Sequence, residues 1–393
     1  MNDINIKLNV VFIGNISFPV GAASSKRRRY MVDYMNMNKI QSHVLVTGFH
    51  NEDSENEVEG VYGLCDYLDI SSSFSIIKAS KYYQKGKSKL KEWFDGNKLN
   101  VLIFHTILDI SEYPFFQFAK NLGYKVIFDQ VETSYVAPGT RTSWKTKIHA
   151  MLNEYVGNIA YKKCDGSFVI SKALLAQNKS KFPKMPLCLL PNSTPILQQK
   201  EKVDFNEIPI ILYTGTYAPK DGVEFLIRAF LKVLEHGYKC KLVLTGRGKP
   251  SDMKVLDLVK NNPNVEYLGR ISDRKLNDVL VNSDILTMTR VDSKFANCGF
   301  PFKVSEYLST ANPIIASKVS DITDYLEHKK NAYLVEPNSV NDIVKGIEFM
   351  LNNKKIALEI GKEGLHVAKT IFSIDAIGLR FVNFLHSLKE NYD

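Results

Sequence analysis

Short apolar runs rich in β-branched residues alternate along this chain with segments of helical spacing. The runs are Asn9–Ile13, His43–Thr47, Val101–His105, Lys125–Asp129, Gly166–Ile170, Ile210–Tyr213, Lys241–Leu244, Val265–Leu268, Asp284–Met288, Pro313–Ala316 and Ala332–Val335. Helical spacing appears between most of them, for example in Val223–Glu235 and Ile343–Leu351. Buried strands that alternate with helices predict doubly wound parallel sheets, and therefore an α/β fold.

The chain is long enough for about two domains, because it has 393 residues. The apolar runs fall into two groups on either side of Leu189–Ile208, a stretch with two prolines and many polar residues that is typical of a linker. A protein of two α/β lobes binds its ligand outside the carboxyl ends of the strands. Apolar residues at 45% and charged residues at 24% exclude a disordered tail and a coiled-coil rod.

Cysteine usage and the N-terminal sequence indicate a cytoplasmic protein. The five cysteines are scattered and form no C-x-x-C pair, which is typical of reduced thiols and excludes a disulfide scaffold. The N-terminus lacks the pattern of a secretory signal, and Leu8–Gly14 is the first predicted strand. No charge-free apolar run reaches the roughly eighteen residues that cross a bilayer.

Positive charge gathers between Ile76 and Phe94. The chain carries 51 Lys and Arg against 42 Asp and Glu, a net charge of +9. Six of the lysines lie at positions 78, 81, 85, 87, 89 and 91, among Tyr82, Tyr83, Leu90, Trp93 and Phe94. One interpretation is a basic amphipathic helix on an anionic membrane surface through Lys78–Lys91. The other is a solvated helix whose lysines only keep the protein soluble. Gly86 weakens the prediction that this stretch is a helix at all. Nucleic acid is disfavoured because no known reading module is present.

Three turns in the C-terminal half carry glycines and cations. The turn Tyr213–Gly222 contains Gly215 and Lys220, and a second turn follows Leu244 with the sequence TGRGK. Glycines let the backbone approach a phosphate, and helix N-termini offer free N–H groups. The third is CGFPFKVSEYL, in which Gly299 and Pro301 form a turn, Lys303 adds a cation and Glu306 follows one turn later. The alternatives are ordinary strand–helix turns with solvent lysines, and a buried capping carboxylate for Glu306.

These segments together resemble the family 4 glycosyltransferases, which retain anomeric configuration and have the GT-B fold of two Rossmann-like domains. The matching runs are GTYAPKDGVEFLIRAF, LVLTGRGKP, VEYLGRIS, LLPNS and GFPFKVSEYLSTANPIIASKVSDITDYLEHKKNAYLVEPNS, which occur in the family's order. The resemblance implies an acceptor domain at 1–190, a hinge at 191–207, a donor domain at 208–372 and a crossover helix at 373–393 that packs on the N-terminal domain.

The resemblance also implies a nucleotide-sugar donor, a UDP- or GDP-sugar, held by the C-terminal domain. Lys220 matches the family's pyrophosphate lysine, while Thr216 stands where many members carry an arginine. Glu306 matches the second glutamate of the E-x7-E motif, which binds the ribose, and Cys298 occupies the first glutamate's position. The full set of expected donor contacts is Gly21, Gly215, Thr216, Lys220, Arg247, Arg290, Cys298, Gly299, Phe300, Pro301, Lys303 and Glu306.

In the N-terminal half, Asp129 resembles the family's polar residue that faces the donor sugar, and His105 ends the preceding strand. Gly21 corresponds to the loop glycine that admits the diphosphate. Together with Lys220, Asp129 and His105 are the expected catalytic residues, with ordinary capping roles as the alternative.

The implied activity is sugar transfer without a metal or other cofactor, since no D-x-D occurs. Preformed N–H groups and cations would stabilise the departing nucleoside diphosphate. The expected acceptor is a glycan or a lipid-linked glycan in cell-envelope or exopolysaccharide synthesis, at the inner membrane face. The alternatives are a nucleotide-sugar epimerase, a phosphorylase, and a non-catalytic nucleotide-sugar-binding module, which the departure at Cys298 keeps open.

Overall fold

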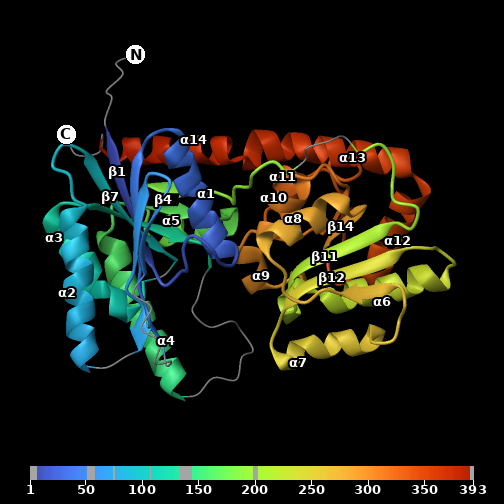
Figure 1. Ribbon diagram of the computed structural model, residues 1–393, viewed down its shortest axis with the longest axis horizontal. Helices are drawn as coiled ribbons and strands as arrows, with labels where there is room; N and C mark the ends of the chain where they lie inside the picture. The colour runs from blue at the N-terminus through green and yellow to red at the C-terminus, as the bar shows by residue number, and fades with distance from the viewer. Residues whose placement is uncertain are drawn as a thin grey trace, which may run out of the picture. The chain divides into compact units, whose positions relative to one another are not determined.

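The computed structural model describes residues 7–50, 58–73, 76–106, 108–132, 144–197 and 202–389. It contains two compact units: unit 1 consists of Met1–Ser193 and Ile377–Asp393, and unit 2 of Thr194–Ala376 (Figure 1). Each unit is built on a largely parallel sheet with helices, so the α/β prediction is confirmed. The expected boundaries of hinge and donor domain stay predictions, and residues 198–201 of the hinge lie outside the described part.

Unit 1 contains an eight-stranded sheet in which every neighbouring pair is parallel except β4–β5. In spatial order its strands are β10 (Leu187–Leu189), β9 (Gly166–Val169), β8 (Lys125–Gln130), β7 (Leu99–His105), β1 (Leu8–Gly14), β2 (Gln41–Val46), β5 (Cys65–Asp69) and β4 (Val58–Tyr62). The short strands β3 (Phe49–His50) and β6 (Ser72–Ser73) pair separately. The sequence patterns miss β4 and β5, because their few apolar residues lie among charged or polar ones, and they miss β10, because it has only three residues.

Helices cover both faces of this sheet. They are α1 (Ala23–Met37), α2 (Ile76–Glu92), α3 (Tyr113–Leu122), α4 (Trp144–Lys163), α5 (Lys172–Lys181) and α14 (Ile374–Ser387), with a short helix η1 (Ile110–Glu112). Helices α2, α3 and α4 share one core with Val11 and Ile13 of β1. Phe12 points to the other face, because successive strand residues alternate. There Phe381 of α14 stacks on Phe12 and Phe168, with ring centroids 6.1 and 5.1 Å apart.

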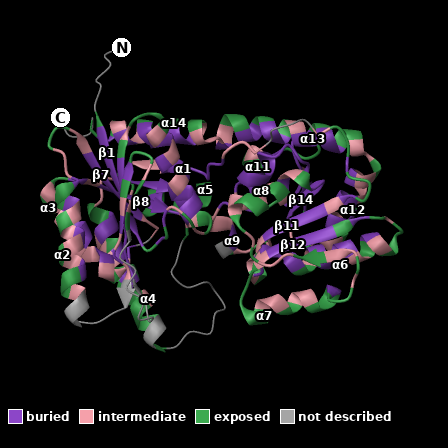
Figure 2. Cartoon of the chain, in the orientation of Figure 1, coloured by how far each residue is buried: buried purple, intermediate pink, exposed green. Residues whose placement is uncertain are grey.

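Helix α2 turns its apolar residues inward. Tyr82, Leu90 and Trp93 are buried in the unit 1 core, and Figure 2 shows both buried and exposed segments along α2. A Cβ on Gly86 would lie 2.5 Å from the Phe115 ring, so this glycine lets α2 and α3 pack closely. The expectation that these aromatic and aliphatic side chains supply lipid contacts is therefore wrong. Whether the lysines meet an anionic surface stays a prediction, and the Lys78 side chain lies outside the described residues.

Unit 2 contains a six-stranded parallel sheet. Its strands, in spatial order, are β13 (Val265–Tyr267), β12 (Lys241–Arg247), β11 (Ile210–Thr216), β14 (Ile285–Met288), β15 (Ile314–Ser317) and β16 (Tyr333–Val335). Its helices are η2 (Pro219–Asp221), α6 (Val223–Glu235), α7 (Pro250–Met253), η3 (Lys254–Val259), α8 (Asp273–Asn282), α9 (Lys294–Cys298), α10 (Phe302–Leu308), α11 (Ile322–Tyr325), α12 (Val340–Asn352), α13 (Lys354–Val367) and the π-helical turn η4 (Ala368–Phe372). The main core lies between β11, β12, α6 and α12.

Across the described residues, no helix combines the length and the apolar character that crossing a bilayer requires.

The packing of α14 in unit 1 depends on a glycine. A Cβ on Gly378 would lie 2.1 Å from the Tyr34 ring of α1. We expect Gly378→Val to lower the free energy of unfolding by about 1–3 kcal/mol, because the added methyl groups overpack this contact. Leu379→Val is the matched control, since Leu379 is 55% exposed on the same helix. Urea denaturation of both variants measures the difference, and equal effects would contradict the packing role.

Candidate functional site

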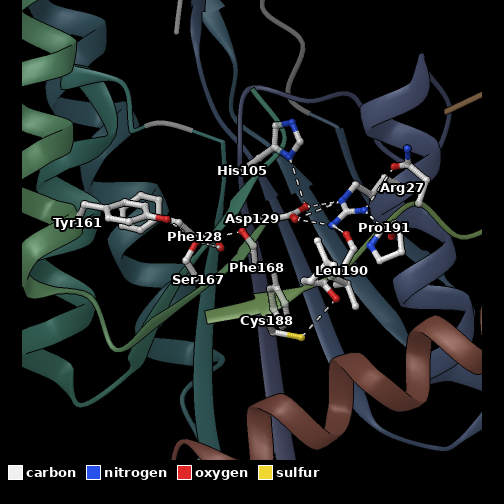
Figure 3. A network of polar contacts seen from close by, with 12 residues as sticks. Arg27, His105, Phe128, Asp129, Tyr161, Ser167, Phe168, Cys188, Leu190 and Pro191 are labelled. Carbon is white, nitrogen blue, oxygen red and sulfur yellow. Dashed lines mark hydrogen bonds and ion pairs between the residues drawn. The ribbon is translucent and has the colours of Figure 1, made fainter. Parts of the chain in front are cut away.

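A buried ion pair lies at the carboxyl edge of the unit 1 sheet (Figure 3). The α1 residue Arg27 donates Nε–H to Asp129 Oδ2 at 2.9 Å and Nη2–H to Oδ1 at 2.7 Å. Its remaining N–H groups reach the carbonyl oxygens of Leu190 and Pro191, both at 2.9 Å. The guanidinium therefore joins α1, the end of β8 and the segment that follows β10.

His105 completes this cluster. The register of β7 and β8 places it beside Asp129, with Nδ1 3.8 Å from Asp129 Oδ2. Burial alone would raise the pKa of Asp129, but Arg27 and His105 outweigh it and hold that pKa well below its ordinary value. Burial lowers the pKa of His105, so the imidazole is neutral near pH 7. The two expected catalytic residues thus contact each other, and their catalytic roles stay predictions.

Polar groups continue along this edge to the end of β2. Thr47 Oγ1 donates to Glu112 Oε1 at 2.9 Å, and the Asp109 N–H donates to Oε2 at 3.2 Å. Burial raises the pKa of Glu112 to about 7. The expected contact Gly21 precedes α1, where a Cβ would lie 2.1 Å from Ser25 Oγ, so the loop turns too tightly for a larger residue.

In unit 2, three glycines allow close approach at the carboxyl ends of β11 and β12. Gly222 has φ +65°, and a Cβ there would lie 2.0 Å from the Thr289 carbonyl oxygen. Gly246 has φ +121°, with the Gly215 carbonyl oxygen 1.7 Å from an added Cβ. Gly215, with φ +139°, leaves the room that Lys303 occupies, since its Cβ would lie 2.7 Å from Lys303 Nζ. These turns require glycine and bring the α10 lysine onto the end of β11.

Lys303 is a largely buried cation whose positive charge is only partly balanced by the groups around it. Its ammonium group lies 4.1 Å from the Tyr213 ring centroid and 3.9 Å from Asp221 Oδ1. Asp221 also accepts a hydrogen bond from Thr216 Oγ1. The side chain of Lys303 is only 13% exposed, so its charge is nearly out of water, and the Asp221 oxygen at 3.9 Å is too distant for a hydrogen bond.

Arg290 and Lys220 add positive potential at the Lys303 ammonium group. Burial is the main reason that the pKa of Lys303 falls to about 8; Arg290 and Lys220 lower it further, whereas Asp221 and Glu306 oppose the shift. Backbone contacts fix both neighbours: the Val291 N–H donates to the Lys220 carbonyl at 3.0 Å, and Arg290 Nη1 donates to the Ala296 carbonyl at 3.4 Å. The unit therefore concentrates positive potential at one end of its sheet.

The remaining unit 2 residues that we expect to contact the donor lie on β11, β12, α9, α10 and the turn between these two helices. The β11–β12 register places exposed Thr216 beside exposed Arg247. Glu306 is buried on α10, three residues after Lys303. Phe300 stacks on Phe372, with ring centroids 5.5 Å apart. Between α9 and α10, Cys298 ends one helix, Gly299 is extended and Pro301 precedes the next.

Sequence reasoning missed two contacts of these clusters. Arg27 was one of three adjacent arginines with no individual signal, and only the fold brings it to Asp129, 102 residues away. Asp221 follows Lys220 directly and read as part of an ordinary turn. An acid directly before the glycine of the turn was the available signal for Asp221.

Within the described ranges, no group of three or more His, Cys, Asp and Glu residues is arranged to hold a metal ion.

Comparisons with known proteins agree on one family. Residues 208–353 match the family described as Glycosyl transferases group 1. An uncharacterized glycosyltransferase of Methanocaldococcus jannaschii is 25% identical over 167 residues, which are 40% of this chain and 41% of that protein. The capsular polysaccharide biosynthesis glycosyltransferase CapM of Staphylococcus aureus is 23% identical over 184 residues, 46% of this chain and 47% of its own length. The matches to these relatives thus span less than half of either chain.

Solved structures share the whole fold at low identity. Sucrose-phosphate synthase from Thermosynechococcus elongatus superposes with a TM-score of 0.74 at 14% identity, covering 98% of this chain and 100% of that one. HepE of Anabaena, solved in complex with UDP, gives 0.67 at 12% identity, covering 96% and 100%. The chain therefore shares its fold with these two structures.

The Arg27 ion pair predicts a large loss of stability when it is broken. We expect Arg27→Met to lower the free energy of unfolding of unit 1 by about 3–5 kcal/mol, because Asp129 would remain buried without a partner. The double variant Arg27→Met/Asp129→Leu should regain part of that loss. Arg29→Met on the same helix is the control, with about 1 kcal/mol or less expected. Urea denaturation measures all three, and a loss in Arg27→Met no larger than in the control would refute a buried, paired charge.

Proposed function

Since the chain belongs to the glycosyltransferase group 1 family, also numbered family 4, and has the GT-B fold, we propose that it transfers a sugar from a nucleotide-sugar donor to an acceptor hydroxyl with retention of configuration. Unit 2 binds the donor. The observation that carries this proposal is the buried Lys303 ammonium group, which has a carboxylate oxygen at 3.9 Å, feels the charges of Arg290 and Lys220, and lies beside three glycine turns.

A diphosphate is the ligand that this cluster suits. Three cations near one buried position repel one another, and an anion between them would relieve that repulsion and restore the ordinary pKa of Lys303. The glycines at the ends of β11 and β12 leave the backbone free of side chains, so phosphate oxygens can approach main-chain N–H groups. A neutral sugar alone would bring no negative charge to the buried Lys303 ammonium group.

The same arrangement assists departure of the leaving group. In the transfer, the bond from the sugar C1 to the phosphate oxygen breaks and a bond from C1 to the acceptor oxygen forms, while the acceptor proton passes to the leaving phosphate. Negative charge grows on the diphosphate as the C1–O bond lengthens. Preformed cations and N–H groups stabilise that charge more in the transition state than in the ground state, so no metal is invoked in this step.

The finer assignments rest on the resemblance. Glu306 binds the ribose hydroxyls, and Cys298, in place of the first motif glutamate, weakens or alters contacts to the donor sugar. Asp129 and His105 face the sugar, and Gly21 admits the diphosphate. Uracil is the proposed base, with support from the UDP complex of HepE. A cell-envelope or exopolysaccharide acceptor at the cytoplasmic membrane face is supported by the likeness to CapM.

Donor binding is tested by isothermal titration with UDP, GDP and ADP. We expect UDP to bind with the highest affinity, and Glu306→Ala to weaken it by about tenfold, because the ribose loses a charge-assisted hydrogen bond. Glu359→Ala is the control, since Glu359 is exposed on α13 and pairs only with Lys362 among the contacts described. If none of the three nucleotides binds, the donor site is refuted.

The products formed from a UDP-sugar distinguish a transferase from an epimerase and from a non-catalytic binding module. A transferase given UDP-sugars and a cell-envelope lipid fraction releases UDP together with glycosylated acceptor. An epimerase converts the UDP-sugar into its epimer without net release of UDP, and a binding module binds UDP but leaves the sugar donor unchanged. Restoring Cys298→Glu in parallel shows whether the departure limits turnover.

The lowered pKa of Lys303 predicts pH-dependent donor affinity. The free protein loses the Lys303 proton near pH 8, whereas the bound diphosphate raises that pKa. Below pH 8 the cation is already present, so affinity is constant; above it, binding must take up a proton and the affinity for UDP falls by up to about tenfold per pH unit. Titrations from pH 6.5 to 9.5 measure this fall. Lys303→Met should bind weakly with no such step, and a step that persists in the variant would contradict the assignment.

A further inference from the structure

The carboxyl edge of unit 1 contains a second buried arginine, which none of the contacts described above involves. Arg28 follows Arg27 on α1 and is 4% exposed. Its Nη1 donates to the Ile16 carbonyl at 3.4 Å and its Nη2 to the Ile13 carbonyl at 3.3 Å, both longer than an ordinary N–H···O hydrogen bond. Within the described part of the chain, Arg28 forms no ion pair with an acidic residue. The guanidinium is therefore almost out of water, with two carbonyl oxygens at long distance as its acceptors.

The two acids whose charges act on Arg28 are engaged elsewhere. Asp129 accepts hydrogen bonds from Arg27 at 2.7 and 2.9 Å, and Glu112 accepts one from Thr47 Oγ1 at 2.9 Å. Burial lowers the pKa of Arg28 to about 10, because it outweighs the attraction of Glu112 and Asp129. The group is still charged near neutral pH, so unit 1 buries a cation that its own acids balance only in part.

Arg28 lies where the strand order of unit 1 reverses. The chain places β2 on one side of β1 and later β7 on the other, and a sheet of this type binds its ligand outside the carboxyl ends of the strands at that point. Gly14 is the last residue of β1. A Cβ there would lie 3.3 Å from both Arg28 Nη2 and the His105 Cβ, so this glycine leaves room for the guanidinium beside the end of β7.

The backbone at this point departs from what the local sequence prefers. Thr106, directly after β7, has φ +55°, a left-handed conformation that β-branched residues rarely adopt. A hydrogen bond from its N–H to the Asp129 carbonyl, at 2.7 Å, holds it there. Gly14 ends β1 with φ +144°, and Gly48 follows β2 with φ +133°. Strained backbone that the surrounding fold maintains gathers at ligand-binding sites, which favours a ligand at the ends of β7, β1 and β2.

We propose that an acceptor binds at this edge of unit 1 and that Arg28 holds an anionic group of that acceptor, either a phosphate or a carboxylate. The planar fork of a guanidinium matches the oxygens of both groups. The Ile16 carbonyl belongs to a loop in which Asn15 and Ser17 are exposed, so the anion enters from solvent and takes the place of this carbonyl. A long hydrogen bond is thereby exchanged for short, charge-assisted ones, which an uncharged sugar cannot provide. This inference rests on the proposed sugar transfer and narrows its acceptor to sugars that carry negative charge.

Binding of matched sugars to the full chain tests this charge preference. Glucose 6-phosphate, glucuronic acid and uncharged glucose are titrated with UDP present at saturation, and saturation-transfer NMR measures each dissociation constant. We expect at least one of the two anionic sugars to bind about tenfold or more tightly than glucose, because a hydrogen-bonded charge pair adds to the same ring contacts. Preference for glucose 6-phosphate assigns a phosphate, and preference for glucuronic acid assigns a carboxylate.

Variants of α1 and of the donor site locate the bound anion. Arg28→Gln keeps a donor for the neighbouring carbonyl oxygens and removes the charge, while Arg28→Met removes both, and both variants should lose the preference for anionic sugars. Arg29→Met on the same helix is the matched control and should retain the preference. Lys303→Met should retain it too, since Lys303 belongs to unit 2.

Urea denaturation separates a binding role from a structural one. Because the chain balances the Arg28 charge only in part, Arg28→Met should lower the urea midpoint less than Arg27→Met, which leaves Asp129 buried without its partner. A midpoint lowered as far as in Arg27→Met would overturn the proposal. Circular dichroism checks the fold of each variant, and Arg28→Gln carries the binding test if Arg28→Met does not fold.

Three binding results would also overturn the proposal. One is that neither anionic sugar binds more tightly than glucose, and another is an anionic preference that persists in Arg28→Gln. The third is a preference that disappears in Lys303→Met, since the anion would then bind in unit 2. Failure of the proposed function is recognised separately: UDP then does not bind, whereas the sugar titrations still report on Arg28.

Discussion

Parallel pairing constrains where chemistry can occur in this protein. Because neighbouring strands run the same way, their carboxyl ends meet at one edge of each sheet, and residues distant in sequence become neighbours there. His105 and Asp129 meet through the β7–β8 register, and Thr216 and Arg247 through that of β11 and β12. The polar clusters of both units follow from this single constraint.

Arg27 and Lys303 differ in how their buried charge is balanced. The Arg27 guanidinium is saturated by the Asp129 carboxylate and two carbonyl oxygens, so its geometry serves to hold three chain segments together. Lys303 has one carboxylate oxygen at 3.9 Å and the face of a tyrosine ring. The fold thus maintains a charge that an incoming anion would stabilise, which is the arrangement that the proposed donor site requires.

Helices α2 and α4 have similar compositions but differ in which side chains the fold buries. Both contain lysines, aromatic residues and aliphatic residues. Tyr82, Leu90 and Trp93 of α2 fill the core, whereas Trp144, Met151 and Tyr155 of α4 remain in solvent. The buried side of α4 combines Tyr161 of the core with small or polar residues such as Gly157 and Asn153.

Periodicity alone determined the α/β class and most of the central strands, because buried parallel strands are continuous apolar runs. The edge strand β4 and its neighbour β5 were missed, since few of their residues are apolar. The glycine turns and Lys303 were visible as residue types at loop positions. Their chemistry was not: the low pKa of Lys303, the Arg27–Asp129 pair and the outward face of α4 depend on burial and on contacts between distant segments. Local sequence sets the elements, whereas desolvation and charge pairing exist only once the elements have packed.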